Sequence, residues 1–362
     1  MSRSNGQAVS TTKGIAGQLF KHRSRYAKEI IATLAVSWFI CCQPVAAATV
    51  DMYVSHTNGV SKYFYDLNTD TVTLDGGFSL GLGGASGLQG PQGLAVGPDN
   101  LLYVVSQDSS PEKIVRFDRT TGAYVSTVAN VPVPNDLVFG PDQSGDGVPD
   151  LYVTEFSNAR AVRIPTQGPG AGGVNVFTTG GSLGGSTMAL TFGPDGNLYI
   201  SGRGANVIQR FDGTTGAFID TFATQASASP VLFSPDGTRF YSGNALANSQ
   251  PLSQFDGSTG GLLDGNFGGN VIDSAQQAAF GPDYNNNGSL DIYVGNGSLG
   301  STNVRVIDGL TGEDLINIIN DLGRPRDILF VGNIVPEPAS GLLFAMGGLG
   351  TLVGIRRGRM RR

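Results

Sequence analysis

Apolar and polar residues alternate along the chain in short runs, and these runs recur as a repeating unit. The landmark of each unit is an apolar stretch centred on a tyrosine. It occurs six times at intervals of 42 to 52 residues, at 52–54, 102–104, 151–153, 198–200, 240–242 and 292–294. Five copies follow an apolar stretch that ends in Gly/Ser-Pro-Asp, and an alternating stretch with a turn comes after most copies. Four short strands per unit, in six units, predict an all-β fold: a six-bladed β-propeller.

The two ends of the repeat region complement each other. The first tyrosine stretch, around Tyr53, has no strand before it, whereas residues 327–332 form a strand with nothing after it. These C-terminal residues follow Arg-Pro much as residues 136–140 follow a proline in another unit. We therefore expect the C-terminal strand to pair with the first blade and close the ring, which removes two open sheet edges. Separate hairpins or a sandwich are the alternative.

The repeat also resembles a known group of proteins. Its spacing and its Gly-Pro-Asp-Gly-x-Leu-Tyr motif, seen at 193–199, are similar to those of NHL-repeat and streptogramin-lyase-like propellers. The resemblance covers residues 50–333. Propellers of unrelated function share such motifs, so the resemblance implies the fold and leaves the function open.

The N-terminal segment has the features of a secretory signal peptide. Basic residues between Lys13 and Lys28 precede an apolar run, Ile30 to Cys42, and then three alanines ending at Ala48. A basic region, a short apolar region and small residues at the cleavage site are typical of such signals. We predict cleavage after Ala48. A retained membrane anchor is the alternative, although thirteen helical residues rise only ~20 Å against a hydrocarbon core of ~30 Å.

The C-terminal segment, residues 336–362, has three parts in order: Pro-Glu-Pro, an apolar stretch over 341–355, and five arginines. It resembles the PEP-CTERM sorting signal of Gram-negative bacteria. The resemblance implies recognition by exosortase-type sorting machinery, transient association with the inner membrane through this segment, and delivery to the cell surface or extracellular matrix. The predicted organisation is thus a signal peptide (1–48), a propeller (49–335) and a sorting signal (336–362).

The distribution of charge narrows the possible functions. The whole chain has a net charge of −6, but residues 49–335 alone carry 12 basic and 27 acidic residues, a net charge of −15. Such a domain is unsuited to binding nucleic acid, which requires an excess of Lys and Arg. Both cysteines, Cys41 and Cys42, lie in the predicted signal peptide. A catalytic thiolate or a cysteine-ligated metal in the propeller is therefore excluded.

Two turns are longer than their counterparts and rich in oxygen ligands. Both follow Asp-x-(Asn/Ser)-x-(Asp/Asn)-Gly-x-x-Asp, with candidate ligands Asp142, Ser144, Asp146, Val148 (backbone), Asp150, and Asp283, Asn285, Asn287, Ser289 (backbone), Asp291. Oxygens at this spacing, with a glycine at the sixth position, suit Ca²⁺. The loops resemble the calcium hairpins of integrin-type propeller repeats, and ordinary Asx-rich turns are the alternative. We predict structural calcium, bound more weakly by the second loop, which has fewer acidic residues.

The face opposite these loops is the expected ligand site. It collects residues that precede the first strand or follow the second strand of each blade, around the mouth of the central channel. The candidates are His56, Gln92, Gln107, Asn135, Asp136, Glu155, Gln277, Asn296, Arg326 and Asp327. The resemblance to streptogramin-lyase-like enzymes, which use a histidine and a carboxylate at the propeller centre, implies His56 and Glu155 as a general acid/base pair. A polar lining of the channel is the alternative.

Two functions follow from these features. The leading hypothesis is an exported, surface- or matrix-associated, calcium-supported propeller that binds an extracellular polysaccharide or protein. The alternative is a secreted lyase or hydrolase, streptogramin-lyase-like or lactonase-like, with its site at the channel mouth.

Overall fold

The computed structural model describes residues 49–246, 252–297 and 302–334. The predicted signal peptide and sorting signal lie outside these residues. Among the residues described, no helix has the length and apolar character needed to cross a membrane. Apart from two 3₁₀ turns, Gly84–Ser86 and Gly269–Val271, the regular structure of this part is β-strand.

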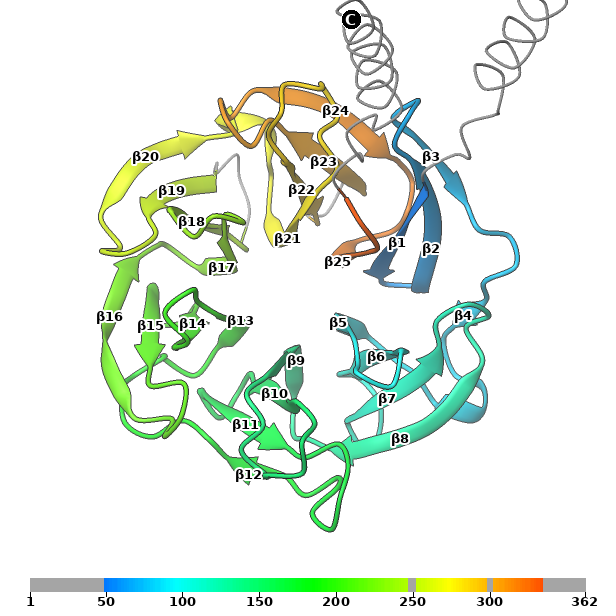
Figure 1. Ribbon diagram of the computed structural model, residues 1–362, viewed down its shortest axis with the longest axis vertical. Helices are drawn as coiled ribbons and strands as arrows, with labels where there is room; N and C mark the ends of the chain where they lie inside the picture. Colours follow the sequence, from blue (N-terminus) through cyan, green and yellow to red (C-terminus); the bar gives the residue numbers. More distant parts are fainter. Residues whose placement is uncertain (1–48, 247–251, 298–301, 335–362) are drawn as a thin grey trace, which may run out of the picture. The chain divides into compact units, whose positions relative to one another are not determined.

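The described strands form six sheets arranged around a central axis (Figure 1). Blade 1 contains β25 (Pro325–Val331), β1 (Thr49–His56), β2 (Gly59–Asp66) and β3 (Thr71–Leu74), with the short β4 (Leu80–Gly81) beside β2. Blade 2 contains β5 (Pro91–Val96), β6 (Leu101–Ser106), β7 (Lys113–Asp118) and β8 (Tyr124–Asn130). Blade 3 contains β9 (Pro134–Gly140), β10 (Asp150–Glu155), β11 (Arg160–Ile164) and β12 (Asn175–Val176).

The other three blades repeat this order from the axis outward. Blade 4 contains β13 (Thr187–Phe192), β14 (Leu198–Gly202), β15 (Val207–Phe211) and β16 (Phe218–Thr224). Blade 5 contains β17 (Ala228–Phe233), β18 (Arg239–Asn244), β19 (Leu252–Asp256) and β20 (Leu262–Phe267). Blade 6 contains β21 (Ala275–Gly281), β22 (Asp291–Asn296), β23 (Asn303–Ile307) and β24 (Asp314–Ile319). The all-β six-bladed propeller predicted from the repeat is confirmed.

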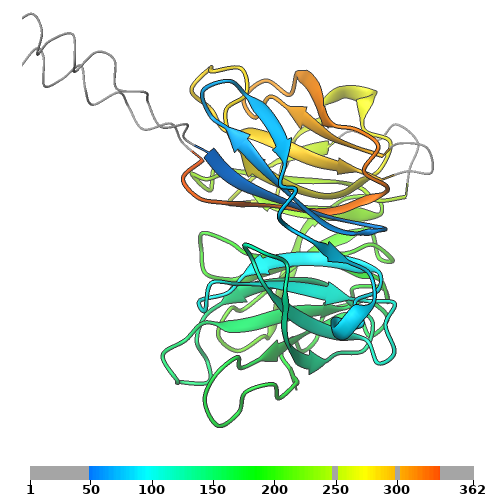
Figure 2. The same ribbon diagram turned by 90° about the vertical axis from the view of Figure 1, so that its right-hand side faces the viewer.

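The ring closes as predicted. β25 pairs antiparallel with β1, with Met52 opposite Phe330 and Val54 opposite Ile328, and becomes the innermost strand of blade 1 (Figure 2). The first and last strands of the propeller therefore share one sheet, and β25 covers the inner edge that β1 would otherwise leave unpaired.

The repeated tyrosines explain why the motif recurs. Tyr53, Tyr103, Tyr152, Tyr199, Tyr241 and Tyr293 each lie on the second strand of a blade with at most 2% of their surface exposed. In five blades the ring meets edge-on a phenylalanine from the inner strand of the next blade, as in Tyr103–Phe139 at 5.0 Å and Tyr293–Phe330 at 4.8 Å between ring centroids. Edge-to-face aromatic pairs contribute about 0.5–1.5 kcal/mol beyond burial. This position therefore joins neighbouring blades.

Blade 3 departs from the repeat in its outer part. In blades 2, 4, 5 and 6 the third strand leads into an Asp-x-x-Thr-Gly turn, where the aspartate accepts backbone N–H groups, as Asp212 does from Thr214 and Thr215. In blade 3 Pro165 stands at this position, and the outer strand β12 has only two residues. The predicted calcium loop of blade 3, Asp142–Asp150, therefore has no aspartate of this turn beside it.

Candidate functional sites at the channel mouth and in two acidic loops

The strand register separates two faces of the ring. Pro134, at the start of β9, lies opposite Glu155, at the end of β10, whereas Gly140 and Asp150 flank the connecting loop at the other end. The starts of the inner strands therefore share one face with the ends of the second strands. We call this face the channel mouth, and the face of the β9–β10 and β21–β22 loops the loop face.

Three of the predicted mouth residues form a hydrogen-bonded chain across neighbouring blades. The Gln92 side chain donates from Nε2 to Oε1 of Gln107 at 3.1 Å, and Nε2 of Gln107 donates to Oδ1 of Asn135 at 3.4 Å. Nδ2 of Asn135 then donates to the backbone carbonyl of Met188 in blade 4 at 2.7 Å. The structure thus brings these amides together at the mouth.

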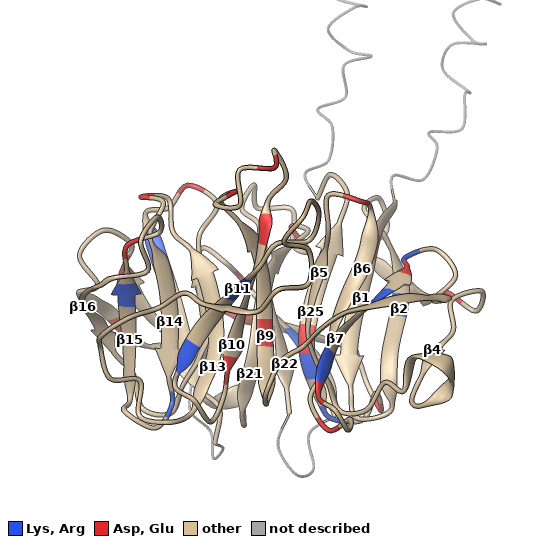
Figure 3. Ribbon diagram, turned by 90° about the horizontal axis from the view of Figure 1, so that it is seen from below, with Lys and Arg blue, Asp and Glu red and all other residues tan. Residues whose placement is uncertain are grey.

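Three further predicted residues meet deeper, on the inner strands β9, β21 and β25, where Figure 3 shows acidic positions on β9 and β25. Nε2 of Gln277 donates to Oδ2 of Asp136 at 2.8 Å, and burial raises the pKa of Asp136 to about 7. Burial, and then the charge of Asp136, raise the pKa of Asp327 well above its usual value. Each aspartate also accepts a backbone N–H from the next blade, Leu190 and Leu94 respectively. These carboxylates tie blades together at a cost in charge burial.

A cavity of about 300 Å³ opens above these residues at the mouth. Its lining includes the predicted Gln107, Asn135 and Arg326, together with residues that the sequence reasoning missed, among them Phe156, Arg203, Gln276 and Arg324. A hollow of about 190 Å³ beside it shares Arg326 and includes Thr57 and Gln92. A larger hollow of about 510 Å³ lies on the loop face between blades 5 and 6.

The position of a residue after the tyrosine of its blade determines whether its side chain faces the mouth. Thr57, Gln107, Phe156 and Arg203 each lie four positions after the tyrosine of their blade, and all of them line one of the two mouth cavities. His56, Glu155 and Asn296 lie three positions after it. Because successive side chains of a strand point to opposite sides, a shift of one residue turns the side chain away from the mouth.

His56, Glu155 and Asn296 accordingly bind within their own blades. Nε2 of His56 lies 3.0 Å from Oγ of Ser61, and burial lowers the pKa of His56. The Glu155 carboxylate, only 1% exposed, accepts hydrogen bonds from Arg160 and Asn158. Oδ1 of Asn296 accepts two backbone N–H groups of blade 6.

His56 and Glu155 belong to blades 1 and 3, with blade 2 between them. In the described part of the chain, no hydrogen bond or ion pair joins these two side chains. Their predicted role as an acid/base pair stays a prediction.

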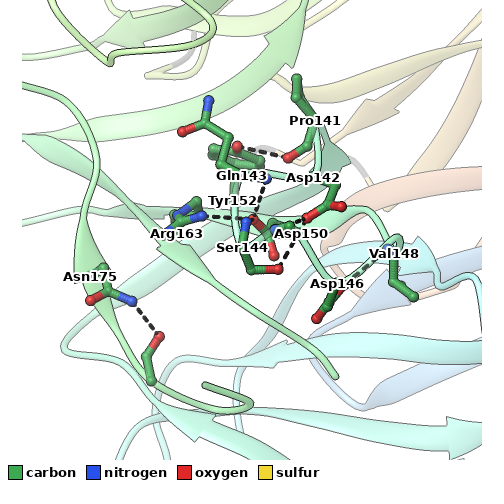
Figure 4. A network of polar contacts seen from close by, with 12 residues as sticks. Pro141, Asp142, Gln143, Ser144, Asp146, Val148, Asp150, Tyr152, Arg163 and Asn175 are labelled. Atoms are coloured by element: carbon green, nitrogen blue, oxygen red, sulfur yellow. Dashed lines mark hydrogen bonds and ion pairs between the residues drawn. The ribbon is translucent and has the colours of Figure 1, made fainter. Parts of the chain in front are cut away.

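On the loop face, the first acidic loop folds around its aspartates (Figure 4). Oδ2 of Asp142 accepts the N–H of Gly147 at 2.8 Å, and Gly147 adopts a φ of 85°, a conformation that favours glycine. Oδ2 of Asp150 accepts the N–H groups of Gln143 and Ser144, and pairs with Nη1 of Arg163 at 2.9 Å. Hydrogen bonds from the loop's own backbone therefore shape it into a tight turn around its carboxylates.

Two oxygens of this first loop stand out. Oδ2 of Asp146 and Oδ1 of Asp150 are buried and have no hydrogen-bond partner. Asp150 itself is fully buried. An unpaired buried acceptor costs about 1–3 kcal/mol, so these two oxygens are candidate ligands for a cation.

The second acidic loop has the same turn but satisfies its oxygens internally. Asp283 accepts the N–H groups of Asn287 and Gly288, and Gly288 has a φ of 90°. Asp291 accepts those of Tyr284 and Gly309. The side-chain amides of Asn285 and Asn287 both donate to Asp308, the aspartate of the Asp-x-x-Thr-Gly turn in blade 6. No carboxylate oxygen of this loop is left buried and unpaired in the described structure.

The second loop, in contrast, has more negative charge around it than the first. Arg163 offsets part of the charge of the first loop, whereas Asp308 adds a carboxylate to the second. Burial, and the charges of Asp308 and Asp283, raise the pKa of Asp291 to about 6. In the described ranges, no three His, Cys, Asp or Glu side chains are grouped as a metal cluster. The predicted calcium shells also depend on Ser, Asn and backbone oxygens, and they stay predictions.

Comparisons with known proteins place the chain by its fold. No protein-family model matches the sequence, and no curated protein matches it. A chain of a nidogen/laminin complex is similar in structure with a TM-score of 0.58 at 14% identity, over 78% of this chain and 98% of that one. The periplasmic gluconolactonase PpgL of Pseudomonas aeruginosa is similar with a TM-score of 0.53 at 14% identity, over 79% and 99%.

A virginiamycin B lyase from Staphylococcus aureus is also similar, with a TM-score of 0.47 at 13% identity, over 73% of this chain and 82% of that one. The lyase match is too distant to support an argument about this chain. At such identities the likenesses show a six-bladed β-propeller and nothing finer about its activity.

Proposed function

We propose that the protein is an exported, surface- or matrix-associated binding module whose ligand site is the channel mouth and whose loop face is supported by calcium. The observation that carries the proposal is the cavity of about 300 Å³ at the mouth, lined by polar side chains from several blades. Ligand sites in proteins are concave and have a few convergent polar groups. Export rests on the sequence of residues 1–48 and 336–362, and calcium on the two acidic loops.

The calcium part of the proposal is supported most strongly at the first loop. Asp146 and Asp150 each keep one buried oxygen without a partner there. A hard cation that prefers oxygen ligands would satisfy both, with Asp142, Ser144 and the Val148 carbonyl as the other candidates. Calcium bound there would stabilise the loop, far from the mouth, and would take no part in ligand binding.

The binding role is tested with variants of the two faces. The full chain would be expressed in a Gram-negative host that carries an exosortase, recovered from outside the cells, and assayed for binding to polysaccharide extracted from the host's matrix. We expect Asn135→Ala and Gln107→Ala to weaken binding, because they break the amide chain of the mouth. Asp236→Ala, at the hollow of the loop face, is the matched control. Equal binding by all variants would refute the mouth as the site.

A secreted lactonase or lyase working at the same mouth is the second candidate. The fold shared with the P. aeruginosa gluconolactonase favours it, because that enzyme has the same architecture over nearly its whole length. His56→Ala and Glu155→Ala would each abolish a measured turnover of lactone substrates if the predicted pair acts. Retained turnover in both variants would exclude this pair.

A further inference from the structure

Three arginines converge on the channel mouth. Arg203 follows β14 in blade 4, and Arg324 and Arg326 lie at the start of β25 in blade 1. All three line the cavity of about 300 Å³. Such a concentration of positive charge is unexpected in a propeller whose residues 49–335 have a net charge of −15.

These arginines form no ion pair with a carboxylate of the described residues. Every ion pair between described residues uses some other lysine or arginine, and no described carboxylate lies within 4.0 Å of these three. Nε of Arg324 is buried without a hydrogen-bond partner. Arg203 lies over the ring of Phe156 at 5.0 Å, and Arg326 makes one long hydrogen bond, 3.4 Å, to Gln276. Their guanidinium groups therefore keep unused donors.

The surroundings make the three charges costly. Burial and the charge of Arg324 lower the pKa of Arg326 to about 10. Burial and Arg324 also lower the pKa of Arg203. Asp108 and Glu112 line the same cavity, and the charge of Asp108 acts on Arg326 in the opposite direction. Asp108 is exposed to solvent, so it offsets the cost only in part.

We propose that the mouth binds a hydroxylated ligand that carries an oxyanion, of which the carboxylate of a uronic acid residue is the form we favour. The planar guanidinium group matches a carboxylate or phosphate with two parallel hydrogen bonds. The side-chain amides of Gln107 and Asn135, which line the same cavity, each use one N–H within the protein, and the other N–H can donate to a sugar hydroxyl. This inference rests on the proposal that the mouth is the ligand site, and it names the ligand's chemistry.

The size of the cavity limits the part of the ligand that enters it. About 300 Å³ lies at the lower end of the ~300–1,000 Å³ typical of ligand pockets. The mouth would therefore hold one sugar residue, such as a terminal residue of an acidic polysaccharide, and leave the rest of the polymer in solvent.

Calorimetric titration of the exported protein with galacturonate, galactose and inorganic phosphate tests the inference. We expect galacturonate to bind at least tenfold more tightly than galactose. Arg324→Gln and Arg203→Gln should each weaken galacturonate binding at least tenfold, and Arg324→Lys should weaken it less. Arg239→Gln, an exposed arginine of the loop face, is the matched control and should bind as wild type does.

A second readout separates a ligand site from a structural role. Because the three half-buried arginines lie around one cavity and form no ion pair, Arg324→Gln should raise the melting temperature of the ligand-free protein while abolishing the increase that galacturonate causes. A lower melting temperature with unchanged galacturonate affinity would overturn the inference.

The remaining outcomes distinguish this inference from the proposed function. Galactose and galacturonate binding equally, in wild type and in Arg324→Gln, would overturn the oxyanion site and leave the mouth as a binding site. Phosphate binding without galacturonate binding would overturn the carboxylate assignment. If none of the three binds, the inference fails. The proposed function fails only if Asn135→Ala also leaves polysaccharide binding unchanged.

Discussion

The two acidic loops share one sequence pattern but differ in how their carboxylate oxygens are paired and in which charged residue lies beside them. The loop Asp142–Asp150 leaves one oxygen each of Asp146 and Asp150 buried and unpaired, and holds Arg163 as a counter-charge. The loop Asp283–Asp291 pairs its carboxylate oxygens but gathers a third carboxylate, Asp308. The spare acceptors favour calcium in the first loop, whereas the net charge favours it in the second.

Part of this difference comes from the loops themselves, where Asp146 stands at the position of Asn287, and part comes from one equivalent position outside them. Asp308 follows the third strand of blade 6, and Pro165 follows that of blade 3. Where the aspartate is present, two asparagine amides of the loop turn toward it. An unpaired buried acceptor destabilises the calcium-free protein, whereas a paired one must first give up its donor. We therefore expect the first loop to bind calcium more tightly, despite its smaller net charge.

The largest difference between the loops is expected from removing their last aspartates. Asp150→Ala breaks a buried ion pair and leaves Arg163 without a partner, which costs about 3–5 kcal/mol. Asp291→Ala removes an acceptor for two backbone N–H groups, which costs about 1–3 kcal/mol. Urea denaturation at pH 7 with a chelator present measures both. Equal losses would contradict the difference in pairing.

The aspartates of the channel, Asp136 and Asp327, are expected to make the stability of the protein depend on pH, independently of the two acidic loops. Burial raises the pKa of Asp136 to about 7, so the folded protein binds more protons than the unfolded chain between about pH 4 and pH 7. This contribution to stability is complete below pH 4 and falls, by on the order of 4 kcal/mol, as pH rises through 7.

The variant Asp327→Asn tests whether the channel aspartates cause this fall, because it removes a second buried carboxyl group whose pKa is also raised. The fall in stability between pH 4 and pH 7 should be smaller in Asp327→Asn than in wild type. Urea denaturation across this pH range, with a chelator, measures it. An unchanged slope would place the titrating groups elsewhere, for instance in the loops.

Calcium itself should have a smaller effect. With a dissociation constant of about 10⁻⁴ M, as in extracellular modules, 1 mM calcium adds about 1.4 kcal/mol per site. Asp146→Asn replaces one spare oxygen and should abolish most of this gain, whereas Asn287→Ala, at the same position of the second loop, should leave most of it. Calorimetric melting with calcium and with chelator compares them. If wild type melts identically in both, the calcium proposal is wrong.

The smallest expected effect isolates the contribution of charge. Arg163→Gln removes the counter-charge of the first loop and should strengthen calcium binding by about 1 kcal/mol, roughly fivefold. Calcium titration of the variant and of wild type measures the change. Weaker binding in the variant would show that Arg163 orients Asp150 and that its charge matters less.

The sequence was sufficient for the fold because the fold repeats. A tyrosine that packs against the next blade must recur in every blade, and the strand missing before Tyr53 is visible at the other end of the chain. The residues of the candidate site at the mouth were predicted only in part. Gln107 was chosen, but the equivalent Arg203 was not, and His56 and Glu155 were placed one residue away from the positions that face the mouth.

The contacts between loops and neighbouring turns could not be predicted from spacing. The two acidic loops match the same pattern. Only the second has asparagine amides that can donate to a carboxylate, but neither loop shows which residue outside it, Asp308 or Arg163, it will meet. These contacts depend on how the third strand of each blade lies beside its first loop. Spacing within the loops carries no information on that packing.

A crystal structure of the exported protein in calcium at about 0.1 mM tests the central difference most directly. The account predicts a cation bound to Asp146 and Asp150 in the first loop, while the amides of Asn285 and Asn287 still donate to Asp308 in the second. A cation in the second loop alone would contradict it and show that net charge determines where calcium binds.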